Sequence, residues 1–511
     1  MSWAYPVANR GMASNPEARL HSPEAIGSSA AWLFGGTLTV ALCLLFMLGT
    51  PSAPFWLATN ALLLSWWVWA FKHPLAAFAC LVFVWVTVYA RASLPMFQVE
   101  IGGSRGGLTL GDLMWLLFVT AWGISWLRTG RGRFSTSLLD THFAFALLVA
   151  YVSLSIILPL LGTLLYNYPL SYVTPGIRTL QVAMLSVVTC QLIRTYGLTT
   201  VVQCLLGTLA LSGILHAVQA LLQILVFMKI ASVEWLVLDH VYQERFSQGL
   251  FIYPRTTGLS VSPMVYGPFG MFLLLIVEAW VLARMPLSKG LKVTLYLSAL
   301  WALLTSASRA GIVGAAAGLL MIYLVLTARS LLWGNAEGLF NLASAALQRV
   351  VAIAVVLLFV RAVVPESLLQ RVALLGTVAT QGAQYDPNTA ERLDLWREAL
   401  DAYERRYVWG TLASPSFIAK HEVGNYTHNF YIDLILQGTP FYLFVFLLML
   451  VSFVWQGWQM CTESKTSSVV ASGLSVIGAT IGLAFVLLTD NQIHAAQFWI
   501  AIGFGLIRRR Q

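Results

Sequence analysis

The chain of 511 residues contains few charged side chains for its length. Asp, Glu, Lys and Arg make up 10% of it, whereas a soluble domain carries about 25%. So few charges cannot cover a water-facing surface of this size, which excludes a soluble protein. We therefore expect membrane lipid around the chain and no nucleic-acid partner.

Several catalytic and structural motifs are also missing. The sequence has no nucleotide-binding loop, no paired carboxylates for a metal-bound nucleotide sugar and no cluster of Cys and His ligands, so we expect no cofactor and no metal. The five cysteines lie outside the largest polar loop, so no disulfide framework is expected. Acidic residues such as Asp112, Glu278 and Asp433 lie near the ends of hydrophobic segments, which disfavours an ion-driven transporter.

Long hydrophobic runs dominate the sequence instead. Ala30–Leu48, Thr199–Met228 and Ser467–Thr489 each exceed or approach the roughly 20 apolar residues that a helix needs to cross a bilayer. They lack a two-residue alternation and are therefore helices rather than barrel strands. The sequence predicts an all-α, polytopic transmembrane bundle of about 12–14 spans. The candidate spans lie near residues 30–50, 55–71, 74–90, 108–127, 138–162, 174–193, 199–228, 259–283, 292–307, 310–328, 350–365, 431–455, 467–489 and 494–507.

The distribution of Lys and Arg predicts the orientation. With the N-terminus inside, sixteen of the thirty Lys and Arg fall on the inner side and seven in the short outer loops. We therefore expect a multi-pass protein of a bacterial cytoplasmic membrane with both termini in the cytoplasm. Residues 1–29 are polar and are interpreted as an uncleaved cytoplasmic tail.

One large loop, residues 365–427, is expected on the periplasmic side. It contains Asn388–Tyr407, in which Leu393, Trp396, Leu400 and Tyr403 recur at three- and four-residue spacing. This spacing predicts an amphipathic helix near the membrane surface, with Asn388 or Thr389 as its N-cap. Arg392 lies four residues before Trp396, from where it could reach a phosphate at the membrane surface.

Arginines also lie at the outer ends of several spans. Arg178 opens the sixth span, Arg255 precedes the eighth in YPRTTGLSVSP, and Arg309 lies in TSASRAG between two spans with almost no loop. The planar guanidinium binds phosphate oxygens in a bidentate manner, so several converging arginines would form a pyrophosphate site. Alternatively, each could extend to lipid headgroups or pair with a nearby acid.

A histidine stands where the large loop enters the next span. His428 and Asn429 belong to GNYTHNFYIDLILQGTPFY. A histidine at this boundary could act as general base for an acceptor that arrives from water, with Asn429 orienting the ring or the acceptor. The alternative is a structural histidine that caps the helix. The other histidines, including His216 and His494, fit structural roles better.

Three passages in this order resemble the O-antigen ligase and polysaccharide polymerase superfamily. They are YPRTTGLSVSP, TSASRAGIVGAAAG, and the arginine-containing loop helix followed by THNFYIDLILQG. The resemblance covers roughly residues 250–507. It divides the chain into the tail (1–29), N-terminal transmembrane helices (30–249) and a ligase- or polymerase-like domain (250–511) that includes the loop 365–427.

The resemblance implies a metal-independent membrane glycosyltransferase whose donor is a glycan linked to polyprenyl (undecaprenyl) pyrophosphate. It implies that Arg309 and Arg392 hold the pyrophosphate, with Arg255 as a further contributor, and that His428 is the base. Arg178, Asn429 and Trp396 are expected to support the site. A single direct displacement would invert the anomeric configuration. Pyrophosphate is already a good leaving group, and the arginines would stabilise the charge that builds on it.

The acceptor is left open by the sequence. A polymerase of O-antigen or exopolysaccharide would use a second lipid-linked glycan, could work with a chain-length regulator, and is slightly favoured by the large loop and the total length. A ligase would use lipid A-core, as in lipopolysaccharide biosynthesis, or, in related enzymes, a protein. A flippase or exporter of lipid-linked glycan is the alternative from another class, but the chain shows no inverted repeat.

Overall fold

The computed structural model describes residues 29–48, 52–87, 93–101, 104–128, 143–168, 173–230, 232, 242–245, 252–260, 262–363, 387–406, 412, 429–489 and 493–506. The expected N-terminal tail, up to residue 28, and most of the loop 365–427 lie outside these residues. His428 does as well.

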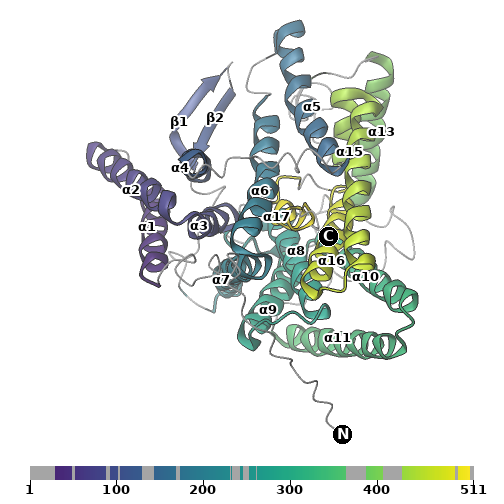
Figure 1. The fold of residues 1–511 in the computed structure, drawn as a ribbon. Coiled ribbons are helices and arrows are strands. Elements are labelled where there is room, and N and C mark those ends of the chain that lie inside the picture. The colour runs from purple at the N-terminus through teal and green to yellow at the C-terminus, as the bar shows by residue number, and fades with distance from the viewer. Residues whose placement is uncertain are drawn as a thin grey trace.

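Each of the fourteen expected spans contains a helix, so the prediction of an all-α polytopic protein is confirmed (Figure 1). Eight of the described helices are long and apolar enough to cross a membrane, and α3, α4 and α17 are apolar but shorter. The helices are α1 (Ser29–Leu48), α2 (Ala53–Lys72), α3 (Pro74–Thr87), α4 (Leu110–Arg128), α5 (Phe143–Tyr166), α6 (Thr174–Tyr196), α7 (Leu198–Phe227), α8 (Pro263–Leu282), α9 (Lys289–Ser306), α10 (Arg309–Leu332), α11 (Ala336–Val363), α13 (Pro387–Arg406), α15 (Phe430–Glu463), α16 (Ser467–Val486) and α17 (Ala496–Gly505).

Two antiparallel hairpins, which hydropathy did not predict, lie between helices. β1 (Ser93–Ile101) pairs with β2 (Ser104–Thr109), and β3 (Tyr242–Arg245) pairs with β4 (Ile252–Arg255). The strands are short and lie in connections, where a hydropathy window is dominated by the neighbouring spans. The second hairpin matters for function because β4 ends at Arg255.

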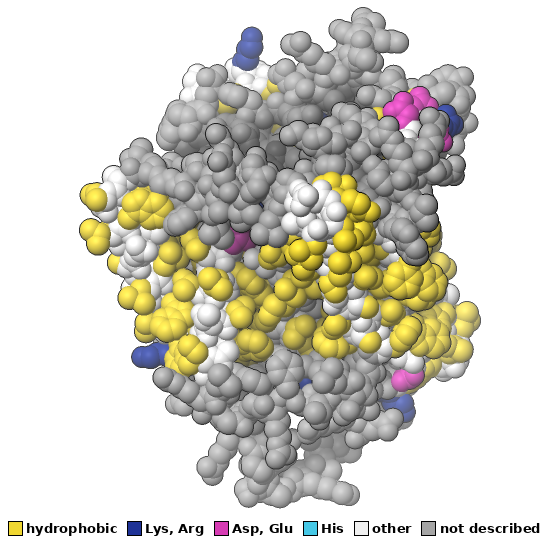
Figure 2. Space-filling model, turned by 90° about the horizontal axis from the view of Figure 1, so that it is seen from above, with side chains coloured by type: hydrophobic (Ala, Val, Ile, Leu, Met, Phe, Trp, Pro, Cys, Tyr) yellow, Lys and Arg dark blue, Asp and Glu magenta, His cyan; other side chains and the backbone are white. Residues whose placement is uncertain are grey.

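The surface of the helical bundle suits a lipid environment. Figure 2 shows a band of hydrophobic side chains across the middle of the visible face, with charged side chains mostly at its margins. Leu57 on α2, Leu320 on α10 and Val451 on α15 are more than 60% exposed. Such exposure would be unfavourable in water and is neutral against lipid tails.

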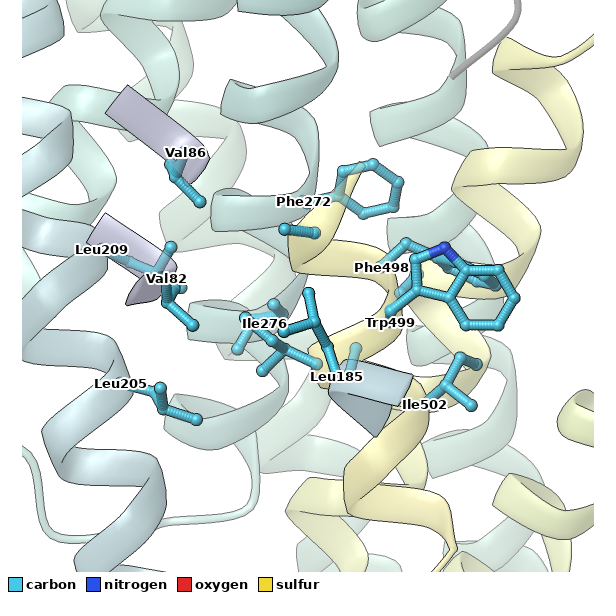
Figure 3. Packing of buried hydrophobic residues seen from close by; sticks show 14 of the residues in the cluster. Val82, Val86, Leu185, Leu205, Leu209, Phe272, Ile276, Phe498, Trp499 and Ile502 are labelled. Carbon is cyan, nitrogen blue, oxygen red and sulfur yellow. The ribbon is translucent and has the colours of Figure 1, made fainter. Parts of the chain in front are cut away.

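The core of the bundle is centred on α8, which is buried along almost its whole length. Figure 3 shows apolar side chains from α3, α6, α7, α8 and α17 meeting there, among them Phe272, Leu185 and Trp499, each 0% exposed. Helices far apart in sequence thus share one core, which fixes how their ends lie relative to one another.

The described residues place the helix ends in two groups. α6, α8, α10, α15 and α17 begin at one end of the bundle, which carries Arg178, Arg309 and Asn429 and is called the site end here. The opposite end carries the last turns of α6, α8 and α10 and the first turns of α9 and α16. Its cationic residues include Arg194, Arg284, Lys289, Lys292, Arg329 and Lys465.

α11 differs from the span expected near residues 350–365. It starts at Ala336 and runs crosswise to α15 and α16 in Figure 1. Arg349 on α11 forms an ion pair of 3.1 Å with Glu278, which lies on the last turns of α8 and is 1% exposed. This buried pair holds α11 against the opposite end of the bundle, an interaction that hydropathy does not detect.

Candidate functional site

Arg309 is the first residue of α10 and follows a tight turn from α9. Ala307 adopts a left-handed conformation with φ of 47°, and the next residue, Ser308, is the N-cap of α10. The Ser308 hydroxyl accepts a hydrogen bond of 3.2 Å from the backbone N–H of Gly311. The turn therefore presents the half-buried Arg309 at a helix N-terminus, where the helix dipole and backbone N–H groups also favour an anion.

Arg255 lies directly against this turn. Its side chain is 3% exposed, and its Nε donates a hydrogen bond of 2.9 Å to the backbone carbonyl of Ser306. The next residue, Thr256, donates from its backbone N–H to the Thr305 carbonyl at 3.0 Å, and the two threonine hydroxyls lie 2.8 Å apart. The structure thus brings Arg255 and Arg309 to the same turn, with Arg255 buried behind it.

A polar face of α7 holds the segment after Arg255 in place. Gln223 accepts a hydrogen bond of 3.0 Å from the Thr257 backbone N–H and donates one of 2.8 Å to the Thr257 hydroxyl. His216 accepts a hydrogen bond of 3.0 Å from the Leu259 N–H at Nδ1, and Nε2 lies 3.1 Å from the Val86 carbonyl. His216 is therefore a neutral, structural histidine.

This polar face was not recognised in the sequence, although a signal for it exists. His216, Gln219 and Gln223 are separated by three and four residues within an otherwise apolar helix, so they share one face. All three are buried. Polar groups buried at this depth need partners, and for Gln223 and His216 those partners include the backbone of the segment that carries Arg255.

Small residues in RAGIVGAAAG allow α10 to approach its neighbours closely. A Cβ on Gly311 would lie 2.9 Å from the backbone of Gly267 on α8. A Cβ on Gly314 would lie 2.7 Å from the Gly482 carbonyl of α16, and one on Gly318 would lie 2.8 Å from that of Gly478. These contacts bring the start of α10, with Arg309, alongside the last turns of α16.

Asn429 caps α15 at the same end of the bundle. Its side-chain oxygen accepts hydrogen bonds from the backbone N–H groups of Tyr431 (3.0 Å) and Ile432 (3.2 Å), and it is 5% exposed. The N–H of Phe430 donates to the carbonyl of Leu487 at 3.0 Å, at the end of α16. The helix cap is therefore Asn429, and the start of α15 is fixed to the α16–α17 connection, residues 487–495.

Arg392 reaches the same connection from α13. Its Nη1 donates a hydrogen bond of 3.2 Å to the backbone carbonyl of Thr489, two residues beyond Leu487. One turn later, Trp396 packs against a small cluster that consists of Ala399, Ile432 and Leu436. Arg392 and the Phe430 N–H thus donate to two carbonyls of one segment, those of Thr489 and Leu487, which no sequence pattern indicates.

The amphipathic helix of the loop is confirmed, with two corrections. α13 begins at Pro387, so Asn388 and Thr389 lie inside the helix and are not its N-cap. Proline is favoured at a first helical position because its missing N–H would have no helical partner there. Leu400 is 37% exposed whereas Ala399 is fully buried, so the packed stripe is centred on Trp396 and Ala399.

A kink in α15 receives the chain that returns from α13. Gly438 and Thr439 have non-helical angles before Pro440, and the Phe441 N–H bonds the Thr439 hydroxyl at 3.3 Å. The carbonyl of Gln437 accepts a hydrogen bond from the Leu412 N–H at 3.0 Å instead of one from Phe441. The kink in QGTPF therefore leaves the Gln437 carbonyl available to the N–H of Leu412.

Arg178 lies near the α16–α17 connection. It lies in the first turns of α6, next to Thr179, whose hydroxyl is 3.2 Å from Nε2 of His494. Burial, together with the charge of Arg178, lowers the pKa of His494 to about 4. His494 is neutral at physiological pH and suits a structural role rather than proton transfer.

The described part of the chain therefore gathers four expected arginines at the site end. Arg255 and Arg309 lie at the α9–α10 turn, while Arg392 and Arg178 lie at the α16–α17 connection. His428, the expected base, lies outside the described residues, but its neighbour Asn429 is fixed at the same connection. Their summed positive charge would favour an anionic ligand at this end.

A family model described as O-Antigen ligase matches residues 294–438. This stretch, less than a third of the chain, is similar to that family. It includes Arg309, Arg392, His428 and Asn429, and it confirms the resemblance to the O-antigen ligase and polymerase superfamily. A comparison with curated proteins finds no match.

The match supports an enzyme of the glycosyltransferase type embedded in the membrane. The matched stretch leaves out several residues that complete the site end. Arg178, Arg255 and the α16–α17 connection lie outside residues 294–438, yet contacts tie Arg255 to the α9–α10 turn and Thr489 to Arg392 within the matched stretch.

Proposed function

We propose that the protein transfers a glycan from polyprenyl pyrophosphate to an acceptor hydroxyl at the site end of the bundle. The observation that supports this most is the gathering of Arg178, Arg255, Arg309 and Arg392 at one end of an apolar bundle, part of which is similar to the O-antigen ligase family. A pyrophosphate on a lipid anchor carries negative charge at the membrane surface, where such arginines would meet it.

Arg309 and Arg392 are proposed to hold the donor pyrophosphate. Arg309 stands at a helix N-terminus, and Arg392 lies across the α16–α17 connection. Arg255 is proposed to contribute positive charge from behind and to hold the α9–α10 turn through Ser306. Their charges would stabilise the pyrophosphate as the bond to the anomeric carbon breaks.

His428 is proposed to remove the proton of the acceptor hydroxyl as its oxygen attacks the anomeric carbon. The new bond forms on the face opposite to the departing pyrophosphate, which takes the bonding electron pair, so the configuration inverts. Asn429 supports this step by fixing the start of α15, because its side chain is already engaged by Tyr431 and Ile432. Trp396 and Arg178 support the surrounding elements. No metal is required in this scheme.

The site end is proposed to face the periplasm, with both termini in the cytoplasm. The opposite end carries Arg194, Arg284, Lys289, Lys292, Arg329 and Lys465. Such an excess of Lys and Arg favours the cytoplasmic side. A cysteine in place of Glu398, on the exposed surface of α13, should react with an impermeant thiol reagent in intact spheroplasts, whereas one in place of Gly290 should react only after permeabilisation.

Two versions of this function differ in the acceptor of the glycan. The chain length and large loop slightly favour a polymerase, whose acceptor is a second lipid-linked glycan. The matched family model, described as O-Antigen ligase, favours a ligase that uses lipid A-core or a protein. A flippase would move the donor without consuming it.

The test is transfer by the purified protein in liposomes with a polyprenyl-pyrophosphate glycan and a chelator. Release of polyprenyl pyrophosphate with a longer lipid-linked glycan identifies a polymerase, and release with glycosylated lipid A-core identifies a ligase. Donor translocation without release in either assay would refute glycosyl transfer. Loss of transfer on adding chelator would refute the metal-free scheme alone.

A further inference from the structure

A cavity of about 450 Å³ lies at the opposite end of the bundle, away from the proposed donor site. Its wall is formed by the last turns of α8 and α10, the first turn of α16 and one side of α11. Because α11 runs crosswise, it forms one wall of the cavity beside the ends of α8, α10 and α16. Among the described residues, none that is assigned to glycosyl transfer lines it.

The wall of this cavity is strongly cationic. Arg284, Arg329, Arg349 and Lys465 line it, and the described lining residues include no Asp or Glu. Arg349 is paired at 3.1 Å with Glu278, whose carboxylate also accepts a hydrogen bond of 2.9 Å from the Tyr323 hydroxyl. Glu278 therefore pairs with one of the four cations that line the cavity.

Two of these cations lie near the same aromatic ring. The guanidinium carbon of Arg329 lies 4.9 Å from the ring centroid of Trp333, and Nζ of Lys465 lies 5.8 Å from the same centroid. Arg329 also donates to the Cys461 carbonyl. Because Arg329 and Lys465 both line the cavity, their charges add to the positive potential of its wall, which favours an anion there.

Polar donors and lipid-facing apolar residues adjoin the cations. Asn341 and Gln348 of α11 line the cavity, and their amides can donate to phosphate oxygens. Outside it, Leu332 at the end of α10 is 67% exposed, and Phe340 and Leu347 on α11 are 75% and 66% exposed. The surroundings thus combine an anion site with an apolar surface for acyl chains, as expected for an interfacial helix.

We propose that this cavity binds the phosphate of an anionic phospholipid headgroup in the leaflet opposite to the glycan-transfer site. Basic pockets between transmembrane helices suit such headgroups, because each Lys or Arg near the surface strengthens the attraction. A bound lipid would bridge α11 to α8, α10 and α16 and so stabilise the crosswise helix. This binding is independent of the identity of the glycan acceptor.

Native mass spectrometry of the full-length protein with phosphatidylglycerol or phosphatidylcholine of identical acyl chains tests the proposal. The wild type should retain phosphatidylglycerol in preference. Arg284 adopts φ of 59°, a conformation that favours glycine, so Arg284→Gly should preserve the backbone while removing one cation. Arg284→Gly and Lys465→Gln should each reduce the preference roughly fivefold, and about twenty-fivefold together.

Arg194→Gln is the matched control, because Arg194 lies at the same end but does not line the cavity. Its lipid preference should equal that of the wild type. An equal preference for both lipids in the wild type, or an unchanged preference in the double variant, would overturn the proposal. Displacement of the lipid by about 10 mM inorganic phosphate would overturn the lipid assignment in favour of a soluble phosphate.

A photoactivatable phosphatidylglycerol provides a measurement that needs no variant. Crosslinks in the wild type should fall on peptides that contain residues 338–349 of α11, the part that lines the cavity. Unlabelled phosphatidylglycerol should reduce these crosslinks and phosphatidylcholine should not. Crosslinks spread evenly over the apolar surface would show ordinary lipid contact and contradict a defined site.

Discussion

Two arginines on α13 allow the proposed donor site to be tested with a matched pair of variants. Arg392 donates from Nη1 to the Thr489 carbonyl, 97 residues away. Arg397, five residues later, pairs with Asp394 at 3.0 Å on an exposed surface, where the two side chains are 76% and 69% exposed. Arg392→Ala should abolish most transfer, whereas Arg397→Ala should leave it unchanged.

The two losses expected for Arg392→Ala differ in size. Removing the hydrogen bond to a carbonyl should lower stability by about 1.5–3 kcal/mol, and by less for a half-buried donor. Removing a group that stabilises the departing pyrophosphate should raise the barrier by about 3–4 kcal/mol, or 10²–10³-fold in kcat. Arg397→Ala removes only an exposed pair, which contributes about 0–1 kcal/mol.

The assay measures the release of polyprenyl pyrophosphate by purified variants, together with their thermal unfolding midpoints. Arg392→Gln separates the two roles of the arginine, because an amide can still donate to the Thr489 carbonyl but carries no charge. Loss of transfer in Arg392→Gln with a near-normal midpoint supports phosphate binding. Recovery of transfer in this variant would refute it and would leave Arg392 as an anchor for α13.

Three further predictions concern other parts of the site end. Arg309→Ala should abolish transfer in a folded protein, and Arg309→Lys should also transfer poorly because an ammonium cannot replace the bidentate fork; normal product from both would refute its role. His428→Ala and His428→Asn should each reduce transfer at least about a hundredfold without weakening donor binding, with His421→Ala as an active control. Because Asn429 already caps α15, normal activity in His428→Asn would refute the role of His428 as the base. Gly314→Ala should lower the free energy of unfolding by about 1–3 kcal/mol through overpacking. Gly207→Ala should not, because no atom lies within 4 Å of the new Cβ. Equal unfolding midpoints of the two variants would contradict the close contact of α10 with α16.

The helices were predictable because each carries its own signal. Lipid requires about 20 apolar residues per span, and every expected span contains a helix. The position of α11 was not predictable, because it is set by tertiary contacts such as the ion pair between Arg349 and the buried Glu278. Hydropathy reports how long an apolar segment is, but the direction in which it lies is decided by such partners.

The arginines of the site were predictable by type, whereas their anchoring was not. Arg309 and Arg392 were identified from their chemistry and place in the sequence, and both lie at the site end. The groups that hold Arg255 and Arg392 are the backbone carbonyls of Ser306 and Thr489. Every residue has a carbonyl, so no residue type marks the few that accept from an arginine.

The small residues of TSASRAGIVGAAAG and the charged residue among them have different tasks. Gly311, Gly314 and Gly318 bring α10 against α8 and α16, and Ser308 caps the helix that begins at Arg309. A side chain at any of the three glycines would separate α10 from its neighbours and move Arg309 relative to the α16–α17 connection. The packing residues therefore set the geometry in which the arginine can act. This explains why the motif combines them in the α9–α10 turn and the first turns of α10.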